Sequence, residues 1–307
     1  MKILVATEKP FSKQATDGIA AIAREGGFEC VLLEKYASVD ELKAAVADAD
    51  ALIVRSDKVT AEVIDAAPRL KIVVRAGAGY DNLDLTACTA RGIVAMNTPG
   101  QNSNAVAELA ISMMIFMARN QFTPGTGHEI SGKRLGIHAY GNVGRIVARY
   151  GRALGMEVMA YDPFISDAAV FAQDGVRMAS SVAELYENSD YLSLHIPATA
   201  ETKGSINYDL LISMPKGATL VNTARKEVID EAGLAKAMAE RTDLQYITDI
   251  APDTAAELAE KFGKRFFATP KKMGAETAEA NVNAGLAAAR QIVAFFKEGI
   301  TRFQVNR

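Results

Sequence analysis

The sequence predicts an α/β protein built from two doubly wound domains, and three observations indicate this. Short apolar segments alternate with amphipathic segments along nearly the whole chain, which is typical of parallel sheets covered by helices. A tight turn rich in small residues joins one apolar segment to a helical run at 139–144. The chain has 307 residues, of which 49% are hydrophobic and 23% charged, so it is globular in composition and long enough for two domains.

Residues 1–97 show five apolar segments separated by helical stretches. The expected strands are Ile3–Ala6, Cys30–Leu33, Ala51–Val54, Ile72–Val74 and Ile93–Ala95. The expected helices are Gln14–Arg24, Asp40–Ala47, Ala61–Ala66 and Leu85–Ala90. This alternation predicts a parallel sheet with helices on both faces.

Two loops of this region follow strands directly, at the edge where open α/β sheets bind ligands. One loop carries Arg55, Ser56 and Lys58, and the other runs from Arg75 to Asp81. Small residues in the second loop leave backbone N–H groups open to an anion such as a carboxylate. We therefore expect a small anionic substrate to be bound here, and the alternative is that the basic side chains are solvated surface charges. The expected substrate contacts are Arg55, Ser56, Lys58, Arg75, Ala76, Gly77, Ala78 and Gly79.

The middle of the chain begins with a helix, Ala105–Arg119, that is apolar around most of its circumference. Such a helix is expected to be buried between domains or between subunits. A loop, Gln121–Lys133, leads from it towards the glycine turn.

The stretch 134–162 has the layout of a dinucleotide-binding unit. An apolar strand, Leu135–Ala139, precedes a turn and a helical run, and a second strand, Met156–Tyr161, ends on Asp162. Backbone N–H groups at the helix start suit a pyrophosphate. Alanine in place of the first glycine of the turn is acceptable if its φ is negative. The residues expected at this helix start are Gly141, Asn142, Val143 and Gly144.

Asp162 can accept hydrogen bonds from ribose hydroxyls. A carboxylate with no neighbouring basic residue repels a 2′-phosphate, so NAD is favoured over NADP. The alternative for the whole stretch is an ordinary strand–turn–helix crossover.

The alternation continues to the end of the chain. The expected strands are Asp190–Ile196, Ala218–Asn222, Gln245–Ile250 and Phe266–Ala268. The expected helices are Glu231–Arg241 and a long one from about Ala278 to Lys297.

Composition argues against several classes of partner. The net charge of −3 and the lack of long basic runs argue against nucleic acid. No apolar run is long enough for a membrane helix, and the start of the chain reads as a strand, not a signal peptide. Cys30 and Cys88 have no metal-ligand spacing and indicate free thiols in a reducing compartment, so we expect a cytoplasmic protein without a metal.

Eight segments together resemble the D-isomer-specific 2-hydroxyacid dehydrogenase family, in the family's order. They are VRSDK (54–58), RAGAGYDNLDL (75–85), MNTPGQNSNAVAEL (96–109), LGIHAYGNVGRIVA (135–148), YDPF (161–164), LHIP (194–197), LVNTAR (220–225) and TP…GAET (269–277).

The resemblance implies a Rossmann-like NAD-binding domain, 98–279, inserted into a flavodoxin-like substrate domain, 1–97 plus 280–307. It also implies an active site in the cleft between the domains and a homodimer formed through 105–119. The chain ends at Arg307, so the C-terminal regulatory modules of longer members, and feedback inhibition by serine through them, are not expected.

The resemblance also assigns roles to residues. Arg225 would hold the substrate carboxylate and polarise its carbonyl, a task that suits a planar bidentate donor. Asp249 would orient the nicotinamide carboxamide. The implied cofactor contacts are Asn102, Val106, Gly141, Asn142, Val143, Gly144, Asp162, His195, Pro197, Thr202, Thr223, Ala224, Asp249 and Gly274.

The proton-transfer group departs from the family pattern. The family usually has a histidine after the Thr-Pro dipeptide, paired with a glutamate, whereas this chain has no histidine after His195 and has Thr254 at the glutamate position. We expect Lys271 or Lys272 to replace the histidine, with a pKa lowered by nearby positive charge. The alternative is a surface lysine pair on a fold that has lost catalysis.

The expected reaction is NAD-dependent oxidation of a D-2-hydroxy acid that carries a further anion, D-3-phosphoglycerate, which feeds serine synthesis. A basic segment that some relatives use near the phosphate is missing between Arg119 and Lys133, so phosphate binding would depend on Arg55, Lys58 and Arg75. Two alternatives stay open. One is another small substrate such as glycerate, glyoxylate or lactate, and the other is a non-catalytic NAD-sensing protein, since transcriptional corepressors share this fold.

Overall fold

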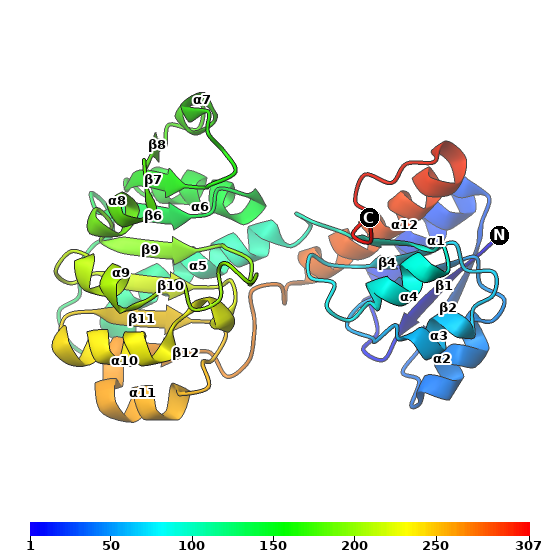
Figure 1. Cartoon of the computed structure of the whole chain (residues 1–307), viewed down its shortest axis with the longest axis horizontal. Coiled ribbons are helices and arrows are strands. Elements are labelled where there is room, and N and C mark those ends of the chain that lie inside the picture. The colour runs from blue at the N-terminus through cyan, green and yellow to red at the C-terminus, as the bar shows by residue number, and fades with distance from the viewer. The chain divides into compact units, whose positions relative to one another are not determined.

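A computed structural model describes all 307 residues and divides the chain into two compact units (Figure 1). Unit 1 comprises Met1–Asn102 and Glu276–Arg307, and unit 2 comprises Ser103–Ala275. These boundaries lie a few residues from the expected positions, 97/98 and 279/280. The backbone N–H of Thr98 donates to the Gly77 carbonyl at 2.9 Å, which attaches the turn after the fifth strand to unit 1.

Unit 1 is a five-stranded parallel sheet in the order β2-β1-β3-β4-β5, the flavodoxin-like order that was predicted. Its elements are β1 (Lys2–Thr7), α1 (Lys13–Gly26), β2 (Glu29–Glu34), α2 (Val39–Val46), β3 (Ala51–Val54), α3 (Ala61–Asp65), β4 (Ile72–Arg75), α4 (Leu85–Ala90), β5 (Val94–Asn97) and α12 (Ala278–Glu298).

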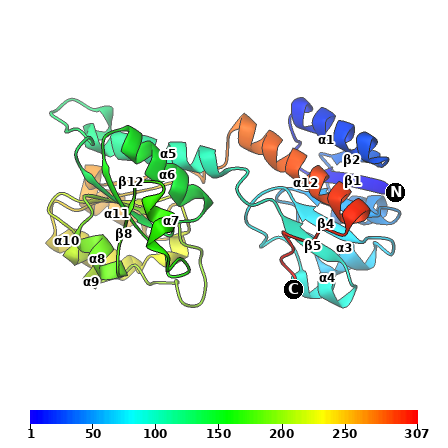
Figure 2. The same cartoon turned by 90° about the horizontal axis from the view of Figure 1, so that it is seen from above.

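Alternate residues of these strands face opposite layers of helices. Ile3 and Val5 of β1 pack with α1 and α12, which lie side by side on one face of the sheet (Figure 2). Leu4 and Ala6 pack with α2, α3 and α4 on the other face. Both faces are therefore buried, which explains why the strands are almost continuously apolar.

The end of the chain covers the exposed edge of β5. The N–H of Val305 donates to the Ala95 carbonyl at 2.8 Å, and the side chain of Asn306 accepts from Ala95 N–H and donates to the Ile93 carbonyl. A covered edge is protected from pairing with another chain.

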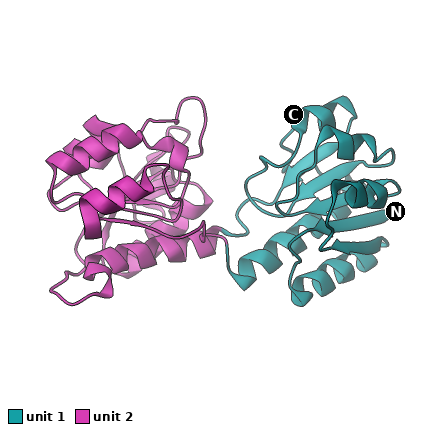
Figure 3. Ribbon diagram, turned by 90° about the horizontal axis from the view of Figure 1, so that it is seen from below, with its two compact units in different colours: residues 1–102, 276–307 teal, residues 103–275 magenta.

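Unit 2 is a seven-stranded parallel sheet in the order β12-β11-β10-β9-β6-β7-β8 (Figure 3). Counted from β6, this is the 3-2-1-4-5-6 order of dinucleotide-binding sheets with one more strand, as predicted. Its elements are α5 (Ser103–Ala118), η1 (Asn120–Phe122), β6 (Arg134–His138), α6 (Asn142–Ala153), β7 (Glu157–Tyr161), α7 (Ala168–Ala172), β8 (Arg177–Met178), α8 (Val182–Glu187), β9 (Tyr191–Leu194), α9 (Tyr208–Ser213), β10 (Thr219–Asn222), η2 (Lys226–Val228), α10 (Glu231–Glu240), β11 (Gln245–Thr248), α11 (Ala255–Phe262), η3 (Gly263–Arg265) and β12 (Phe266–Ala268).

Two helical layers enclose this sheet as well. Helices α5, α6 and α7 cover one face, and α8, α9, α10 and α11 cover the other. Met113, Met114 and Met117 of α5 are buried in the core of unit 2. Much of the apolar surface of α5 is thus buried inside its own unit.

Two further observations bear on the sequence analysis. Both cysteines, Cys30 and Cys88, are free. None of the helices combines the length and apolar character needed to span a bilayer.

Candidate functional site

The carboxyl ends of the unit 2 strands bring many of the expected cofactor residues to one edge of the sheet. Asp162 follows β7, His195 follows β9, Thr223 follows β10 and Asp249 follows β11. The order of the strands reverses between β6 and β9, so the crevice between these two strands is the expected ligand position.

The turn between β6 and α6 is shaped by two small residues. Ala139 has a φ of +79°, so the negative φ that would make alanine easily acceptable at this position is not present. A left-handed conformation is costly for an alanine, and the surrounding contacts must hold it in place. A Cβ on Gly144 would stand 2.3 Å from the Ala139 carbonyl oxygen, so only glycine lets the helix approach this turn so closely.

Gly141 leaves open space at the start of α6. It is the N-cap residue, no side chain caps the helix there, and a Cβ on it would have no protein atom within 4 Å. The first N–H groups of α6 therefore have no intrahelical acceptor and no side-chain cap, which is the arrangement that binds a phosphate in this kind of turn.

Asp162 is held beside this turn by two backbone N–H groups. Its Oδ2 accepts from Tyr140 N–H at 2.8 Å, and its Oδ1 accepts from Phe164 N–H at 3.0 Å. Each oxygen keeps a further lone pair that can accept from a ribose hydroxyl.

The loop after β10 is shaped by Asn222. Its Oδ1 accepts from Ala224 N–H and its Nδ2 donates to the Arg225 carbonyl, both at 3.0 Å. The Thr223 hydroxyl is buried and has no partner. The loop thus presents the half-buried Arg225 and an unsatisfied hydroxyl at the same edge of the sheet.

Asp249 is fully buried after β11, and only one of its oxygens is satisfied. Oδ2 accepts from Gly274 N–H at 2.7 Å and from Met273 N–H at 3.3 Å, whereas Oδ1 has no partner. Burial raises the pKa of this carboxyl, and the N–H groups and the charges of Lys272 and Arg225 oppose the shift.

The surroundings of Asp249 contain three more of the expected residues. A Cβ on Gly274 would lie 2.9 Å from the Asp249 carboxylate and 3.3 Å from Val106, so glycine is required at this close contact. The charges of Arg225 and Lys272 both act on Asp249, which places the two cations in its neighbourhood. Lys271 and Lys272 are both exposed, and the carbonyl of Lys271 accepts from the Thr269 hydroxyl.

Two histidines lie at the carboxyl ends of β6 and β9. The N–H of His195 donates to the His138 carbonyl, and its ring is hydrogen-bonded to Ser193. Burial lowers the pKa of His138 to about 4 and that of His195 to about 3, so both rings are neutral near pH 7. Neither is suited to gain and lose a proton at that pH. In the next loop the Thr202 hydroxyl donates to the Pro197 carbonyl and fixes the turn.

The expected substrate residues belong to unit 1, at the carboxyl ends of β3 and β4. Ser56 and Lys58 are exposed. The guanidinium of Arg55, in contrast, donates to the Lys9 and Pro10 carbonyls and to Asn281 Oδ1. Most of its hydrogen-bonding capacity is therefore used inside the fold.

The second substrate loop also contains internal contacts. Arg75 Nε donates to the Arg55 carbonyl at 3.0 Å, and the guanidinium of Arg75 covers Gly77 so closely that a Cβ there would clash. Asn97 Nδ2 donates to the Ala78 carbonyl at 2.6 Å. Ala76 and Gly77 are buried, whereas Ala78 is exposed. Asn102 is the last residue of the first segment of unit 1.

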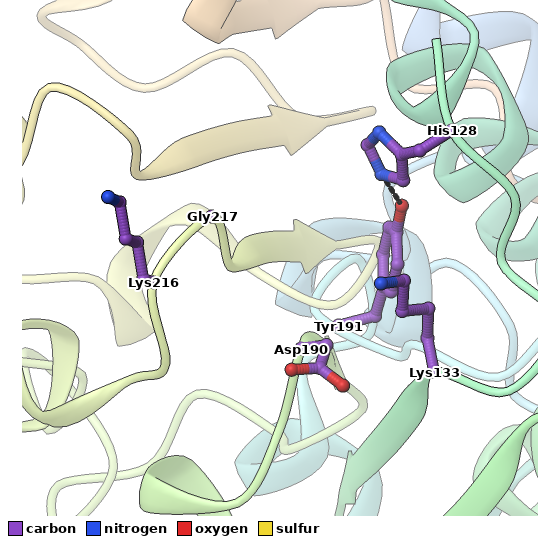
Figure 4. Close-up of a pocket in the computed structure, with 6 residues that line it drawn as sticks. All are labelled: His128, Lys133, Asp190, Tyr191, Lys216 and Gly217. Atoms are coloured by element: carbon purple, nitrogen blue, oxygen red, sulfur yellow. Dashed lines mark hydrogen bonds between the residues drawn. The ribbon is translucent and has the colours of Figure 1, made fainter.

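A hollow of about 210 Å³ lies at the opposite, amino edge of the unit 2 sheet (Figure 4). His128 and Tyr191 are hydrogen-bonded on one side of it, and Lys216 stands on the other. It contains none of the expected site residues, so it is separate from the dinucleotide turn. Its lining residues are His128, Lys133, Asp190, Tyr191, Lys216 and Gly217.

Two side chains at the site did not follow from the sequence reasoning. Asn222 shapes the loop that carries Arg225, and Tyr140 occupies the centre of the phosphate turn. Asn222 lies in the matched segment 220–225. An asparagine whose side chain hydrogen-bonds to the backbone two residues further on is a sequence signal for such a turn. The burial of Tyr140 has no local signal, because its partners lie far along the chain.

The fold and these groups define a dinucleotide-binding protein of the doubly wound α/β class. A sequence model described as "D-isomer specific 2-hydroxyacid dehydrogenase, NAD binding domain" matches residues 107–271. The chain belongs to the D-isomer specific 2-hydroxyacid dehydrogenase family and contains its NAD-binding domain.

Individual relatives agree with this assignment. The D-3-phosphoglycerate dehydrogenase of Mycobacterium tuberculosis is 38% identical over 274 residues, which is 82% of this chain and 50% of that protein. The enzyme of the same name from Archaeoglobus fulgidus is 36% identical over 326 residues, covering 100% of this chain and 59% of that protein. The chain thus spans about half the length of the curated relatives that it matches.

Solved structures show the same fold. The NAD⁺-bound 3-phosphoglycerate dehydrogenase of Entamoeba histolytica is 50% identical, covers 100% of this chain and 99% of its own, and has a TM-score of 0.88. D-2-Hydroxyisocaproate dehydrogenase is similar in fold alone, with 21% identity and a TM-score of 0.82.

Proposed function

We propose that this chain oxidises D-3-phosphoglycerate to 3-phosphohydroxypyruvate with NAD, and that Arg225 and Lys272 carry out the chemistry. The observation that carries the proposal is the buried Asp249, which has one unsatisfied oxygen and two cations in its neighbourhood, at the same edge of the sheet as the dinucleotide turn. The substrate is suggested by the 50% identity to the NAD⁺-bound 3-phosphoglycerate dehydrogenase.

The residues present fit NAD. Gly141 leaves room for a phosphate at the start of α6, and Asp162 can accept from the ribose. Asp249 Oδ1 and the Thr223 hydroxyl are buried without partners, so a ligand that hydrogen-bonds to them would relieve an unfavourable burial. A carboxamide N–H₂ is such a donor for Asp249. Bound NAD supplies the hydride acceptor of the reaction.

Arg225 would bind the substrate carboxylate with its planar guanidinium and polarise the bond at C2. The proton of the C2 hydroxyl needs an acceptor as the hydride leaves. His138 and His195 are buried and are not suited to the task, since the pKa of each lies well below 7.

Between the two candidate lysines, we assign the acid/base role to Lys272. The charge of Lys272, like that of Arg225, lowers the pKa of Asp249. Lys271 instead interacts through its backbone carbonyl, which accepts from the Thr269 hydroxyl. The neighbouring guanidinium and the positive charge of oxidised nicotinamide would lower the pKa of a lysine here. A lysine with a lowered pKa is more often the neutral amine, and the amine can accept the proton of the C2 hydroxyl as the hydride leaves C2 for NAD⁺.

The test combines substrate comparison with two matched variants. NADH formation is followed by absorbance with 3-phosphoglycerate, glycerate and lactate. Lys272→Ala should lower kcat by about 10²-fold or more, while Lys271→Ala should change it less than about threefold. NAD affinity, measured by calorimetry, should be unchanged in both. If neither variant slows turnover, the lysine mechanism is wrong; if no substrate is turned over, a non-catalytic NAD-binding protein is the better reading.

One observation favours a second candidate, an unphosphorylated D-2-hydroxy acid. Because Arg55 donates to two carbonyls and to Asn281, it has little capacity left for a phosphate. Arg55→Ala should raise KM for 3-phosphoglycerate more than KM for glycerate if the side chain binds phosphate. Equal changes in both KM values, together with a lower Tm, would assign Arg55 to folding alone.

We also propose that the chain forms a homodimer. Ile115 of α5 and Leu154 after α6 line a hollow of about 330 Å³ on the surface of unit 2, and Leu154 is 40% exposed. Ala118 and Ile130 also line the hollow, together with the polar residues Arg119, His128, Glu129 and Ser131, so the surface suits a contact that combines apolar and polar groups. Light scattering should give twice the mass of one chain, and Leu154→Glu should shift it to one chain.

A further inference from the structure

Tyr140 connects three parts of unit 2 at the centre of the phosphate turn. It stands between the left-handed Ala139 and the open Gly141. Its backbone N–H donates to Asp162 Oδ2 at 2.8 Å, and its hydroxyl donates to Asp174 Oδ2 at 2.7 Å. The side chain is completely buried, which is unusual for a residue within a ligand-binding turn.

The partners of this side chain come from the segment that follows β7. The ring stacks on Phe171 of α7 at a centroid distance of 4.7 Å, and Asp174 lies in the turn before β8. β8 pairs with β7, and α7 packs against β8 (Figure 1). Arg145 of α6 contacts both residues of this hydrogen bond. Its guanidinium lies 4.8 Å from the centroid of the Tyr140 ring and forms a 3.1 Å ion pair with Asp174.

We propose that Tyr140 is a positioning residue for the dinucleotide site: its main chain holds the ribose-binding Asp162, and its side chain fastens the phosphate turn to the α7–β8 segment through Asp174. The inference rests on the proposed binding of NAD at this turn.

The physical reason is the conformation of the turn. A left-handed alanine is unfavourable by itself, so the turn keeps this shape only while contacts on its far side hold it. The hydroxyl of Tyr140 and its carboxylate acceptor supply a charge-assisted hydrogen bond there. When the tether is removed, the unliganded turn populates other conformations, and the apparent Kd for NAD rises as the competent fraction falls.

The test is Tyr140→Phe, with Tyr191→Phe as the matched control. Tyr191 is also a buried tyrosine of the same sheet, and its hydroxyl is hydrogen-bonded at 2.8 Å to His128, but at the amino edge. We expect Tyr140→Phe to raise the Kd for NAD in calorimetry by about five- to tenfold. Tyr191→Phe should change the Kd less than twofold, although both variants should have a lower Tm.

A second pair of variants separates the tether from simple packing. Asp174→Asn keeps an acceptor for the hydroxyl and should stay near the wild-type Kd, whereas Asp174→Ala should resemble Tyr140→Phe. The double variant Tyr140→Phe/Asp174→Ala should be no weaker than Asp174→Ala, because that variant already removes the Tyr140–Asp174 hydrogen bond together with the Arg145–Asp174 ion pair.

Hydrogen exchange of the unliganded protein gives a readout that does not depend on NAD. The amides of 139–145 should exchange faster in Tyr140→Phe and unchanged in Tyr191→Phe. Equal Kd values for Tyr140→Phe and wild type, equal weakening by both variants, or unchanged exchange would each overturn the inference. A wild-type chain that binds no NAD would instead overturn the proposed function, and the exchange experiment would still decide whether Tyr140 orders the turn.

Discussion

A single methyl group, added at either of two glycines three positions apart, should have different effects on folding and on NAD binding. At Gly141 an added Cβ has no protein atom within 4 Å, and the backbone angles, φ −84° and ψ −157°, suit alanine. Reduced freedom of the unfolded chain would stabilise Gly141→Ala by about 0.5 to 1 kcal/mol. The loss of glycine at a helix N-cap costs a similar amount. The free energy of unfolding should therefore stay within about 0.5 kcal/mol of wild type.

At Gly144 the added methyl group would clash with neighbouring atoms of the protein. It would stand 2.3 Å from the Ala139 carbonyl oxygen and 3.0 Å from Ile137 Cγ2. A backbone carbonyl cannot rotate away as a side chain can, so α6 must shift from the strand, which costs about 1–3 kcal/mol. The better helix propensity of alanine returns up to about 1 kcal/mol. Gly144→Ala should therefore lower the free energy of unfolding by about 1–2 kcal/mol.

Urea unfolding and NAD calorimetry separate these effects. Gly141→Ala should unfold like wild type but bind NAD at least tenfold more weakly, because its methyl occupies the space beside the free N–H groups of α6. Gly144→Ala should be less stable and also bind NAD more weakly. Wild-type affinity in Gly141→Ala would show that no phosphate approaches this turn. Wild-type stability in Gly144→Ala would refute the close contact of helix and turn.

Three further predictions concern buried polar groups. Burial lowers the pKa of His138 from 6.5 to about 4. Between these pH values the unfolded chain binds a proton that the folded chain does not. The free energy of unfolding therefore falls by up to about 3 kcal/mol as the pH drops from 6.5 towards 4. His138→Gln should therefore flatten the pH dependence of unfolding in that window, and an unchanged slope would refute this. Asp249→Asn should raise the Tm of the unliganded protein, since burial disfavours the carboxylate, yet weaken NAD binding; a lower Tm would contradict it. Asn306→Ala leaves Ala95 N–H and the Ile93 carbonyl without partners and should cost about 2 kcal/mol in urea unfolding, with no change in NAD affinity.

Most of the fold was predictable because local sequence and topology agree. Strands buried on both faces are almost continuously apolar, and turns between them carry the expected small residues, so the main strands lie within a few residues of their predicted positions. The exceptions are short elements such as α7 (Ala168–Ala172) and β8 (Arg177–Met178). Five residues in α7 and two in β8 are too few to show a hydrophobic period. These elements therefore depend on tertiary contacts, such as the stacking of Phe171 on the Tyr140 ring.

Candidate residues for the site could be named from the sequence, but the contacts of their atoms could not. Position in a matched segment indicated Asp162 and Arg225, and the family resemblance indicated Asp249. The structure adds which of their atoms are already used. The positive φ of Ala139 could not be foreseen, because alanine does not favour it and the contacts of the folded turn must hold it. The internal use of Arg55 depends on Asn281, which is more than two hundred positions away in the sequence.

The distribution of unsatisfied polar groups connects the fold to its function. Five buried side-chain atoms lack a hydrogen-bond partner, and those of Thr7, Thr98, Thr223 and Asp249 follow or end a strand at its carboxyl end. Burying such a group without a partner costs about 1–3 kcal/mol, so chance placement would be expected to be spread over the fold. These groups are concentrated at the carboxyl edges of the two sheets. Each unit therefore has its polar groups without hydrogen-bond partners at the edge where a ligand can satisfy them. In unit 2 these atoms belong to Thr223 and Asp249, at the same sheet edge as Arg225 and the dinucleotide turn, so the binding of NAD should stabilise that edge through bonds that the unliganded chain cannot form by itself.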